Sequence, residues 1–381
     1  MSALKADVII VGGGFMGAAS AFFLRQRGLS VILLERGLIG QQASGVNFGN
    51  VRRQGRAIEQ LPLANRSREI WGRLKGLIGE DVELMLSGHL RVGYRPEHAE
   101  RLETYARDAE PYGLGLQMLT AQAVRERFPF LGPEVTAGCY APHDGHANPR
   151  LAAPAFGRAA VRAGARVLEN TEILHVEKAG EDFAVEAADG RQFAAPTVLI
   201  TAGAWGDRIS AAFGEPVPMQ VKGPQTCVTE PVPYAVAPTI GLATDVPEEI
   251  VYFRQVARGN IVIGGGGHEP VDTENRRAYV HPHRTLMTLA QLPRVVPAFN
   301  RLSIIRVWSG IEGYMQDSRP VMGPSARVPG LYYAFGFSGH GFQLGPGVGD
   351  VMAELIHTGA TSTPIGPYHI GRFAAPAAQA A

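Results

Sequence analysis

The stretch DVIIVGGGFMGAASAFFLRQRGLSVILLER, residues 7–36, decides the fold of this chain. It opens with an apolar run at 8–11 and breaks into three consecutive glycines. An apolar-periodic segment then runs through Leu24, and a second apolar run ends at Glu35. This order predicts a strand, a tight turn, a helix and a second strand.

The spacing of Gly12, Gly14 and Gly17 has a physical reason. Gly12 permits the turn, Gly14 lets a pyrophosphate approach the backbone, and Gly17 lets the helix pack on the strand. The phosphates would lie at a helix N-terminus, where unpaired N–H groups and the helix dipole favour an anion. Glu35, at the end of the second strand, is placed to accept hydrogen bonds from a ribose diol. The stretch therefore predicts an adenine dinucleotide site; the alternative is a glycine-rich turn of purely structural use.

Length and composition limit the function classes. With 381 residues and 45% hydrophobic content, the chain can form sizeable cores, and we expect two domains. The formal net charge is +1, only 19% of the residues are charged, and no acidic or basic block occurs. Nothing therefore indicates a nucleic-acid or membrane-surface partner, and we expect a small ligand.

Cysteine usage and hydropathy predict a cytoplasmic protein. Cys139 and Cys227 are the two cysteines, and their spacing supports neither a disulfide framework nor a thiolate metal site. The first strand begins at about Val8, which leaves no room for a secretion signal. The longest apolar runs fall far below about 18 residues, so we expect no membrane-spanning segment.

The segment after Glu35, RGLIGQQASGVNFGNVRRQGR, predicts a loop that wraps a ligand. It offers small donors and close backbone approach at some positions and positive charge at others. These positions are Ser44, Asn47, Gly49 and Asn50, followed by Arg52, Arg53 and Arg56. The alternative is a solvated surface loop.

The middle of the chain predicts ordinary packing elements and a further strand beside the ligand. Helices are expected at 57–79, at 96–112, from Thr120 to before Pro129 and at 150–163, with strands at 166–168, 176–185 and 197–201. The last strand runs into TAGAW, where Gly203 and Trp205 are candidates for the ligand site. Trp205 could equally be a core residue.

Residues 216–300 change to proline-punctuated β segments followed by a helix at 283–292, which predicts a second domain with an antiparallel sheet. Tyr252, Arg254 and His268 lie on or beside its strands and could line a pocket floor; each could instead be structural. Residues 306–309 are expected to re-enter the first domain.

The segment GLYYAFGFSGHGFQLGPGVGDVMAELIHTG, residues 330–359, predicts a strand at 331–335, a glycine-dense loop and a helix that begins near Pro346. Loop amides and the helix N-terminus would direct partial positive charge to one spot. A reduced flavin, which is negative at N1 and O2, would be stabilised there, whereas a nicotinamide has no such requirement. The alternative is a glycine-rich turn before a packing helix.

Five segments together resemble flavoproteins of the D-amino acid oxidase, glycine oxidase and monomeric sarcosine oxidase family. They are VIIVGGGFMGAASAFFL, LLER, TAGAW, GIEGYMQDSRPVMG and GFSGHGFQLGPGVGDVMAELI, and the similarity extends over nearly the whole chain. The resemblance implies an α/β fold: a Rossmann-like FAD-binding domain with an inserted antiparallel-sheet (α+β) substrate domain. It also implies FAD as cofactor and oxidation of a C–N bond in an amino acid or secondary amine, with hydride transfer to flavin N5.

The resemblance also implies domain bounds and cofactor positions. The FAD-binding domain would comprise 1–85, 140–215 and 306–381, and the substrate domain 86–139 and 216–305. No flavin-linking cysteine occurs near 313–316, so we expect non-covalent FAD. The expected cofactor-binding residues are Gly12, Gly14, Gly17, Glu35, Arg36, Ser44, Asn47, Gly49, Val176, Gly203, Trp205, Gly339, His340, Gly341, Phe342 and Gln343.

On the substrate side the resemblance is mixed. Tyr252 and His268 fall where sarcosine oxidases place an aromatic residue and a histidine, and Arg52 or Arg53 falls where that branch has a carboxylate-binding arginine. Glu312, however, replaces the substrate-carboxylate arginine of glycine and D-amino acid oxidases. Gln343 replaces a lysine of the sarcosine oxidases, and the oxygen-activating lysine of that branch is absent from NIVIGGGGH, residues 260–268.

These substitutions predict an unusual substrate and acceptor. A carboxylate at Glu312 would repel a substrate carboxylate, so we expect it to face a cationic or amine group while Arg52 or Arg53 holds a carboxylate. The alternative is that Glu312 caps a turn or pairs with Arg319. Without a nearby lysine, a quinone, a dye or a partner subunit is expected to outcompete oxygen as acceptor.

Two other functions stay open at this point. A flavin monooxygenase shares the first glycine motif, although the segment at 339–350 is closer to the amine-oxidising pattern. The chain could also be the flavin-carrying subunit of a hetero-oligomeric sarcosine or opine oxidase that is inactive alone.

Overall fold

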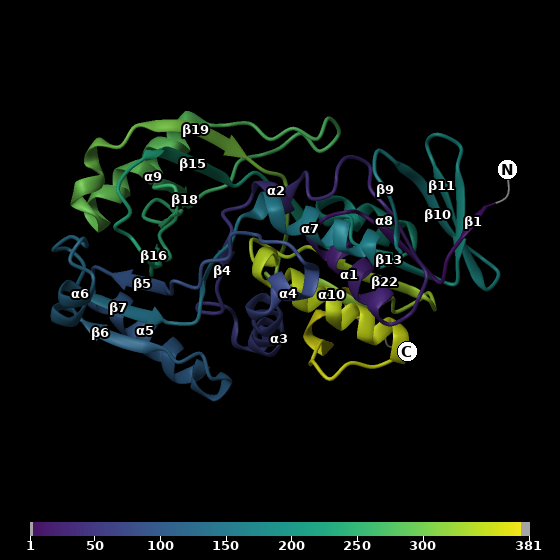
Figure 1. The fold of residues 1–381 in the computed structure, drawn as a ribbon, viewed down its shortest axis with the longest axis horizontal. Helices are drawn as coiled ribbons and strands as arrows, with labels where there is room; N and C mark the ends of the chain where they lie inside the picture. Colours follow the sequence, from purple (N-terminus) through teal and green to yellow (C-terminus); the bar gives the residue numbers. More distant parts are fainter. Residues whose placement is uncertain (1–2, 375–381) are drawn as a thin grey trace, which may run out of the picture.

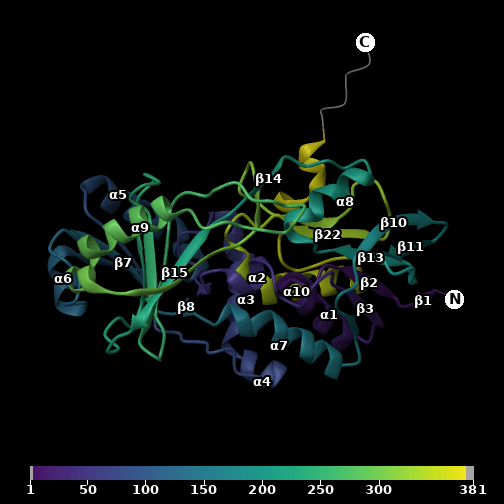
Figure 2. The ribbon, with the colours of Figure 1, turned by 90° about the horizontal axis from the view of Figure 1, so that it is seen from above.

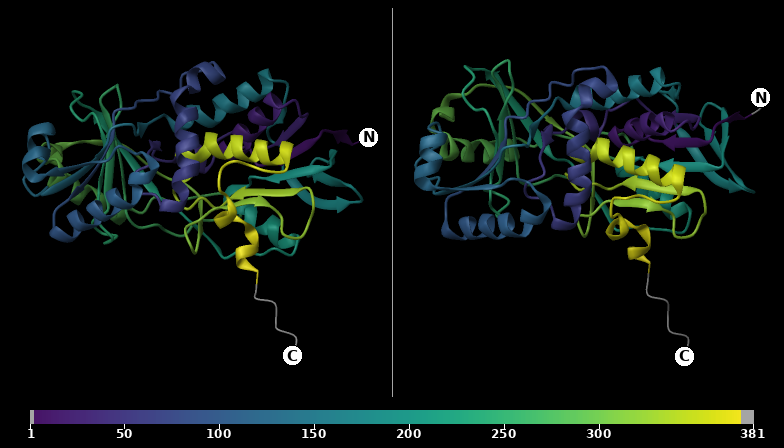
Figure 3. Two further views of the ribbon diagram at one scale, coloured as in Figure 1. Left: turned by 90° about the horizontal axis from the view of Figure 1, so that it is seen from below. Right: turned by 60° about the horizontal axis from the view of Figure 1, so that its bottom comes forward.

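The computed structural model describes residues 3–374 and has two regions. A six-stranded sheet with its helices forms one region, and an eight-stranded sheet forms the other (Figure 1). Both views of Figure 3 show α3 (Leu61–Gly72) standing at the junction of the two regions. The fold class expected from the sequence, a Rossmann-like domain joined to a second sheet domain, is confirmed.

The six-stranded sheet is built around residues 7–36. These form β2 (Val8–Val11), α1 (Phe15–Gln26) and β3 (Val31–Leu34), as predicted. The strand order is β21-β22-β13-β2-β3-β9, with all neighbours parallel except β21. The further strands are β9 (Arg166–Leu168), β13 (Thr197–Ile200), β21 (Val321–Pro324) and β22 (Leu331–Phe335).

Both faces of this sheet are covered, which explains why its central strands are continuously apolar. Val8 and Ile10 pack against α1, α7 (Pro149–Arg162) and α10 (Gly341–Thr358), which Figure 2 shows together on one side of the strands. Ile9 and Val11 pack against a four-stranded sheet on the other face. That sheet has the order β1-β12-β11-β10, with β1 Leu4–Lys5, β10 Ile173–Ala179, β11 Asp182–Ala187 and β12 Gln192–Ala195.

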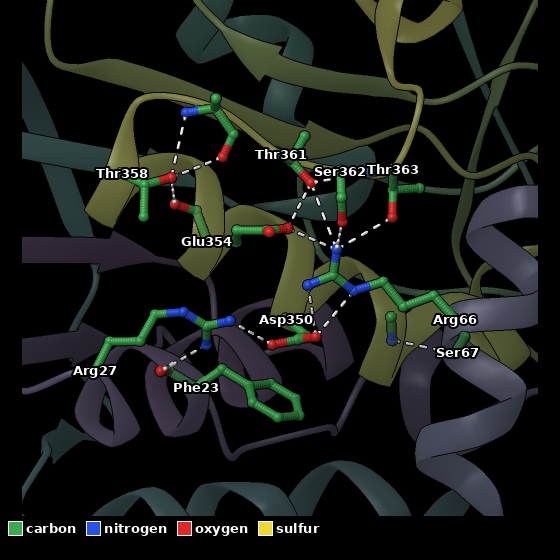
Figure 4. A network of polar contacts seen from close by, with 12 residues as sticks. Phe23, Arg27, Arg66, Ser67, Asp350, Glu354, Thr358, Thr361, Ser362 and Thr363 are labelled. Atoms are coloured by element: carbon green, nitrogen blue, oxygen red, sulfur yellow. Dashed lines mark hydrogen bonds and ion pairs between the residues drawn. The ribbon is translucent and has the colours of Figure 1, made fainter.

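Helices α1 and α10 cross closely because glycines face the contact. A Cβ atom at Gly345 would lie 2.5 Å from the Phe15 ring, and one at Gly349 would lie 2.5 Å from the Ala19 Cβ. Ion pairs reinforce the crossing: Asp350 accepts from Arg27 of α1 and from Arg66 of α3, each at 2.7 Å (Figure 4). The middle of α10 is thereby fixed against α3 and the C-terminal end of α1.

The eight-stranded sheet has the order β19-β15-β18-β17-β16-β5-β7-β6. It is antiparallel except for the parallel pair β16–β5, so the fully antiparallel sheet expected from the sequence is corrected at that pair. Its strands are β5 (His89–Gly93), β6 (Gln117–Thr120), β7 (Ala137–Ala141), β15 (Gln225–Pro231), β16 (Thr239–Leu242), β17 (Val251–Gln255), β18 (Asn260–Gly265) and β19 (Ile304–Ser309).

Two expected boundaries are wrong. Residues 306–309 do not re-enter the first region, because β19 pairs antiparallel with β15 at the edge of the eight-stranded sheet. The last long helix begins at Gly341 rather than near Pro346, so Pro346 lies inside α10. The sequence expectation took this proline for a first-turn residue, as prolines often are.

The remaining elements join or flank the two regions. Helix 57–79 is observed as three pieces, and no helix of the described residues is long and apolar enough to cross a membrane. The elements are α2 (Ala43–Val46), β4 (Asn50–Val51), η1 (Ile58–Gln60), α4 (Leu74–Ile78), α5 (Pro96–Ala109), η2 (Glu110–Tyr112), α6 (Ala121–Arg127), β8 (Gly145–His146), η3 (Gly203–Trp205), α8 (Gly206–Ala212), β14 (Met219–Lys222), α9 (Pro282–Val295), η4 (Pro297–Arg301), β20 (Glu312–Met315), η5 (Gly366–Tyr368) and η6 (Ile370–Phe373).

Candidate active site

A long cavity opens at the carboxyl ends of the parallel strands β2, β3, β13 and β22. Residues from the ends of these strands line it: Val11, Leu34, Thr201 and Phe335. The loop segment 41–56 supplies another part of the wall, as the sequence predicted for a ligand-wrapping loop. Ligands of doubly wound sheets bind at this edge.

One part of the cavity wall is the N-terminus of α1. Gly12 has φ +110°, a conformation that favours glycine, and a Cβ atom at Gly17 would lie 2.0 Å from the Gly12 carbonyl oxygen. Gly14 is the N-cap of α1 and makes no side-chain cap. The Ser44 hydroxyl accepts a hydrogen bond from the Phe15 N–H at 2.8 Å and fixes the loop over this end. Gly17 does not line the cavity but allows the close packing predicted for it.

Glu35 and Trp205 lie along the same wall. The Glu35 carboxylate accepts from the N–H groups of Gly13 at 2.6 Å and Gly37 at 2.7 Å, so it also holds the turn that it borders. The Arg36 guanidinium stacks over the Trp205 ring at 4.8 Å, and the Trp205 indole donates to the Thr273 carbonyl. Trp205 therefore borders the cavity, together with Gly203, rather than lying in the core.

Loop residues Asn47 and Gly49 also line the cavity, whereas Val176 does not. The Asn47 side chain accepts from the Gly49 N–H at 2.8 Å and shapes the loop. Val176 lies in β10 and packs against the hydrophobic cluster below the six-stranded sheet. The expectation that Val176 binds the cofactor is corrected: Ile173, where β10 begins, borders the cavity instead.

Another part of the cavity wall is the N-terminus of α10, where Gly339, His340, Gly341 and Phe342 line it. His340 is the N-cap position and makes no side-chain cap. Burial, together with the positive charges of Arg52 and Arg56, holds the pKa of His340 well below its ordinary value, so its imidazole is neutral. The His340 side chain thus caps no amide at this helix N-terminus.

Gln343 borders the cavity in the first turn of α10, but its side chain points elsewhere. Its amide nitrogen donates to the Ala64 carbonyl of α3 at 2.9 Å, and the side chain is buried. The expected substrate-facing role of Gln343 is therefore corrected. The reason is the earlier start of α10, which turns residue 343 toward α3.

Of the two candidate arginines, Arg52 lines the cavity and Arg53 does not. The Arg53 guanidinium is buried against Asp144 and Asn65, which makes it structural. The Arg52 guanidinium donates to the Gln54 carbonyl, and Arg56 reaches the same cavity. Burial and the neighbouring Arg52 charge lower the pKa of Arg56 to about 9. This end of the cavity is thus rich in partly desolvated positive charge.

Glu312 also lines the cavity. Its carboxylate accepts from the Gly339 N–H at 2.9 Å and from the Tyr314 hydroxyl at 3.2 Å. Burial raises the pKa of Glu312, while the two hydrogen bonds act in the opposite direction. Of the alternative roles expected for Glu312, the pair with Arg319 is wrong, because Arg319 pairs with Glu59, whereas the bond from the Gly339 N–H agrees with the capping of a turn.

Tyr252 and His268 stand behind the cavity wall. The Tyr252 ring packs edge-on against Phe48 with centroids 4.8 Å apart, and Phe48 lines the cavity. Burial and the Glu312 charge raise the pKa of Tyr252 to about 12, whereas Arg52 acts to lower it. The charges of Glu312 and Arg52 therefore both influence the Tyr252 phenol. The His268 Nε2 atom lies 3.1 Å from the Tyr314 hydroxyl.

Arg254, another candidate for the pocket floor, holds the loop rather than a ligand. Its Nε donates to the Phe48 carbonyl at 2.7 Å, and its Nη1 lies 3.2 Å from His146 Nδ1. The hydrogen bond from Arg254 thereby fixes the backbone of Phe48, which lines the cavity.

The residues present fit a bound dinucleotide. The N-termini of α1 and α10, whose N-cap residues make no side-chain cap and whose first turns hold no acidic residue, border one cavity. Glycines give close backbone approach at both ends, and Glu35 lies past the end of β3. Such an arrangement suits a ligand with a diphosphate near α1 and a group that gains negative charge near α10.

A family model described as "FAD dependent oxidoreductase" matches residues 7–355 of the chain. This chain belongs to that family. The FAD-dependent oxidoreductase is 30% identical to the glycine oxidase of Geobacillus kaustophilus (strain HTA426), over 96% of this chain and 98% of that protein. It is 26% identical to one of the subunits of the opine oxidase of Rhizobium meliloti, over 98% and 100% of the two chains.

The fold of this FAD-dependent oxidoreductase also matches solved structures. L-proline dehydrogenase from P. horikoshii superposes with a TM-score of 0.90 at 26% identity, covering 98% of each chain. The protein is therefore an FAD-dependent enzyme of the amine- and amino-acid-oxidising kind, as oxidase or dehydrogenase. The flavin monooxygenase alternative is set aside.

Sequence reasoning missed one residue of this oxidoreductase that contacts two predicted ones. Tyr314 hydrogen-bonds with Glu312 and lies within hydrogen-bonding distance of His268. A signal existed, because residues i and i+2 of a strand share one face, and Glu312 and Tyr314 have that spacing in β20.

Proposed function

We propose that the enzyme oxidises the C–N bond of a small substrate that carries both a carboxylate and an amine, giving an imine. The imine then hydrolyses to a keto acid or aldehyde plus an amine. The observation that supports this most is that Arg52 and Glu312 line the same cavity, with Tyr252 under the influence of both charges. The substrate classes that fit are D-amino acids, N-alkyl amino acids, imino acids and opines.

The side chains divide the binding task by charge. Arg52 holds the substrate carboxylate, and its planar guanidinium fixes the orientation of that group. Glu312 attracts the amine and repels a second carboxylate. Phe48 and Tyr252 provide an apolar wall that keeps water away from the carbon to be oxidised.

FAD, when bound, supplies the two-electron acceptor for the hydride leaving that carbon. The chain's own contribution is positioning: the amine and carboxylate anchors bring the α-carbon to one end of the cavity, beside the N-terminus of α10. The amides of α10 stabilise negative charge at this end. Cys139 and Cys227 are buried outside the cavity, which supports non-covalent binding of the cofactor.

An anaerobic screen tests this function without assuming an acceptor. Glycine, sarcosine, L- and D-proline, further D-amino acids and opines are mixed with the FAD-loaded protein, and loss of flavin absorbance is recorded. We expect bleaching by amines that bear a carboxylate and none by the corresponding amides. Equal bleaching by amide and acid would contradict the role of Arg52, and no bleaching by any amine would contradict the function.

The natural acceptor is proposed to be a quinone or a partner protein rather than oxygen. The cations among the described cavity residues are arginines, and none is a lysine. The lysine-free segment 260–268 supports the same proposal.

A second candidate function is a flavin-carrying subunit that needs a partner chain. The full-length similarity to a protein named as one subunit of an opine oxidase favours it. Purification of this chain alone and bleaching with an amine from the screen separates the two. A protein that binds FAD but is bleached only after a partner is added would support this second function.

A further inference from the structure

Tyr314 lies between two titratable side chains. Its hydroxyl donates to Glu312 Oε2 at 3.2 Å and lies 3.1 Å from His268 Nε2. Strand β20 places Glu312 and Tyr314 on one face, and the bridge between Gly223 and Glu269 fixes the segment of His268 beside β14. Because β14 pairs with β20, the three side chains are held by one small two-stranded unit.

If the enzyme oxidises an amine, as proposed above, Glu312, Tyr314 and His268 can serve to remove a proton from the substrate. An amine is mainly an ammonium ion near neutral pH, and an ammonium nitrogen has no lone pair to stabilise loss of hydride from its carbon. The substrate must therefore lose a proton before the hydride leaves, and an ammonium ion that binds as such must lose it inside the cavity. Glu35 and Glu172 are the other carboxylates among the described cavity residues, and both belong to the end near α1. Glu35 already accepts two backbone N–H groups.

We propose that Glu312, Tyr314 and His268 form a proton relay that carries the ammonium proton out of the cavity. The substrate N–H bond breaks, and its proton forms an O–H bond on Glu312. Glu312 then passes this proton on to the Tyr314 oxygen, while the Tyr314 hydroxyl proton passes to His268 Nε2. The imidazolium of His268, which is partly exposed, releases its proton to water, and every group of the relay regains its starting form.

The surroundings of each group suit this direction. Glu312 faces Tyr252 on β17, Tyr314 and the Gly339 amide, and its pKa is raised by burial, which helps it to accept a proton. Burial raises the pKa of Tyr314 far above its ordinary value, so this hydroxyl passes a proton only by exchange.

The outer end of the relay favours proton release. His268 faces Tyr314 on β20, Lys222 on β14 and Arg284 on α9. Burial and these two cations lower the pKa of His268. A proton that reaches this imidazole is therefore given up readily to water.

Tyr314→Phe removes the relay oxygen and keeps the ring. With the amine that bleaches the flavin fastest in the screen, we expect anaerobic flavin reduction to slow by about 10²-fold at neutral pH. The loss should shrink as the pH rises, because free neutral amine then binds without needing the relay. Tyr94→Phe is the matched control, since the Tyr94 hydroxyl is buried without a hydrogen-bond partner among the described residues.

A binding measurement gives a second readout that is independent of turnover. Calorimetry in two buffers of different ionisation enthalpy counts protons released when the amine binds anaerobically. We expect the wild type to release a proton with the amine and none with its quaternary N-methylated analogue, for example betaine against sarcosine. Tyr314→Phe should lose most of the release.

The outcomes separate the relay from the function on which it rests. Bleaching of the wild type with an unchanged pH profile and unchanged proton release in Tyr314→Phe would overturn the relay alone. A uniform slowing of Tyr314→Phe at every pH would also overturn it, because a packing role predicts that result. Absence of bleaching in the wild type would instead contradict the proposed function.

Discussion

At the scale of single residues, Glu312 is the position where the cavity departs most from the pattern that the chain resembles. A partly buried carboxylate is costly unless hydrogen bonds or a cation compensate it. Gly339 and Tyr314 supply two hydrogen bonds. A substrate amine would supply the cation, which gives this carboxylate a role beyond holding a loop.

Glu312→Gln tests that role. The amide keeps the shape and can still accept from Gly339, but it loses the charge, so we expect kcat/KM for an amine substrate to fall about 10- to 100-fold. Stopped-flow flavin reduction measures the change, and the FAD content of the purified variant checks the fold. Glu134→Gln, at an exposed position in the other region, is the control. An unchanged kcat/KM would contradict charge recognition by Glu312.

Arg52 and Arg53 allow a paired comparison. Arg52→Gln should weaken binding of a carboxylate-bearing substrate by about 1.5–3 kcal/mol, with little effect on thermal stability. Arg53→Gln leaves the buried Asp144 without its ion-pair partner, so it should lower the melting temperature instead. Substrate titration and thermal unfolding of both variants check this assignment. Weaker substrate binding in Arg53→Gln together with a lower melting temperature in Arg52→Gln would contradict it.

The neighbouring residues illustrate what the sequence could predict. The glycine spacing predicted the turn and both strands because those roles are local. Arg52 and Arg53 could not be told apart, since they are adjacent and only the position of Asp144 decides between them. Tyr314 was missed for the same reason: its partner His268 is distant in sequence.

At the scale of elements, the crossing of α1 and α10 positions both helix N-termini at the cavity. The crossing depends on the glycines of α10, because larger residues would push the helices apart. The start of α10 was placed too late from the sequence, since Pro346 resembles a first-turn proline and only packing against α3 reveals the extra turn.

Gly345→Ala tests the crossing. The added Cβ would lie 2.5 Å from the Phe15 ring, so we expect a loss of about 1–3 kcal/mol in the free energy of unfolding and weaker FAD binding. Gly76→Ala in α4 is the matched control, because its Cβ meets no atom within 4 Å. The control should gain about 0.5–1 kcal/mol from helix propensity. Equal melting temperatures for the two variants would contradict tight packing between α1 and α10 at Gly345.

The ion pair between Arg95 and Glu249 predicts an acid-sensitive contact in the other region. Hydrogen bonds from Arg95 lower the pKa of Glu249 to about 2, from an ordinary value of 4.5. The stabilising effect is therefore present above pH 4.5 and is lost as the pH falls toward 2. Glu249→Gln should lower stability at neutral pH and flatten its decline across this range. Denaturant unfolding at several pH values measures the slope, and parallel curves for variant and wild type would contradict the prediction.

At the scale of the whole molecule, the pairing of the edge strand β19 could not be predicted from the sequence. Residues 306–309 were expected to re-enter the first region. Its actual partner is β15, some way back in the chain. Strand pairing of this kind depends on the register of the assembled sheet and not on local pattern.

The cavity as a whole predicts the behaviour toward oxygen. Enzyme reduced anaerobically by an amine should be reoxidised slowly by air and much faster by a soluble quinone, because no lysine lies among the described cavity residues. Stopped-flow mixing with each acceptor compares the two rates. Reoxidation by air as fast as by the quinone would contradict the dehydrogenase assignment.

The strand order of the six-stranded sheet has a consequence for synthesis of the protein. Strand β2 pairs with β13, and β13 pairs with β22. Helix α1 packs against α10, which is synthesised more than 300 residues later. At about 10 residues per second, β22 leaves the ribosome roughly 30 s after β2. During that time the nascent chain exposes the apolar faces of β2 and α1, which makes it a client for chaperones. Loading of the cofactor must then follow synthesis of β22 and α10.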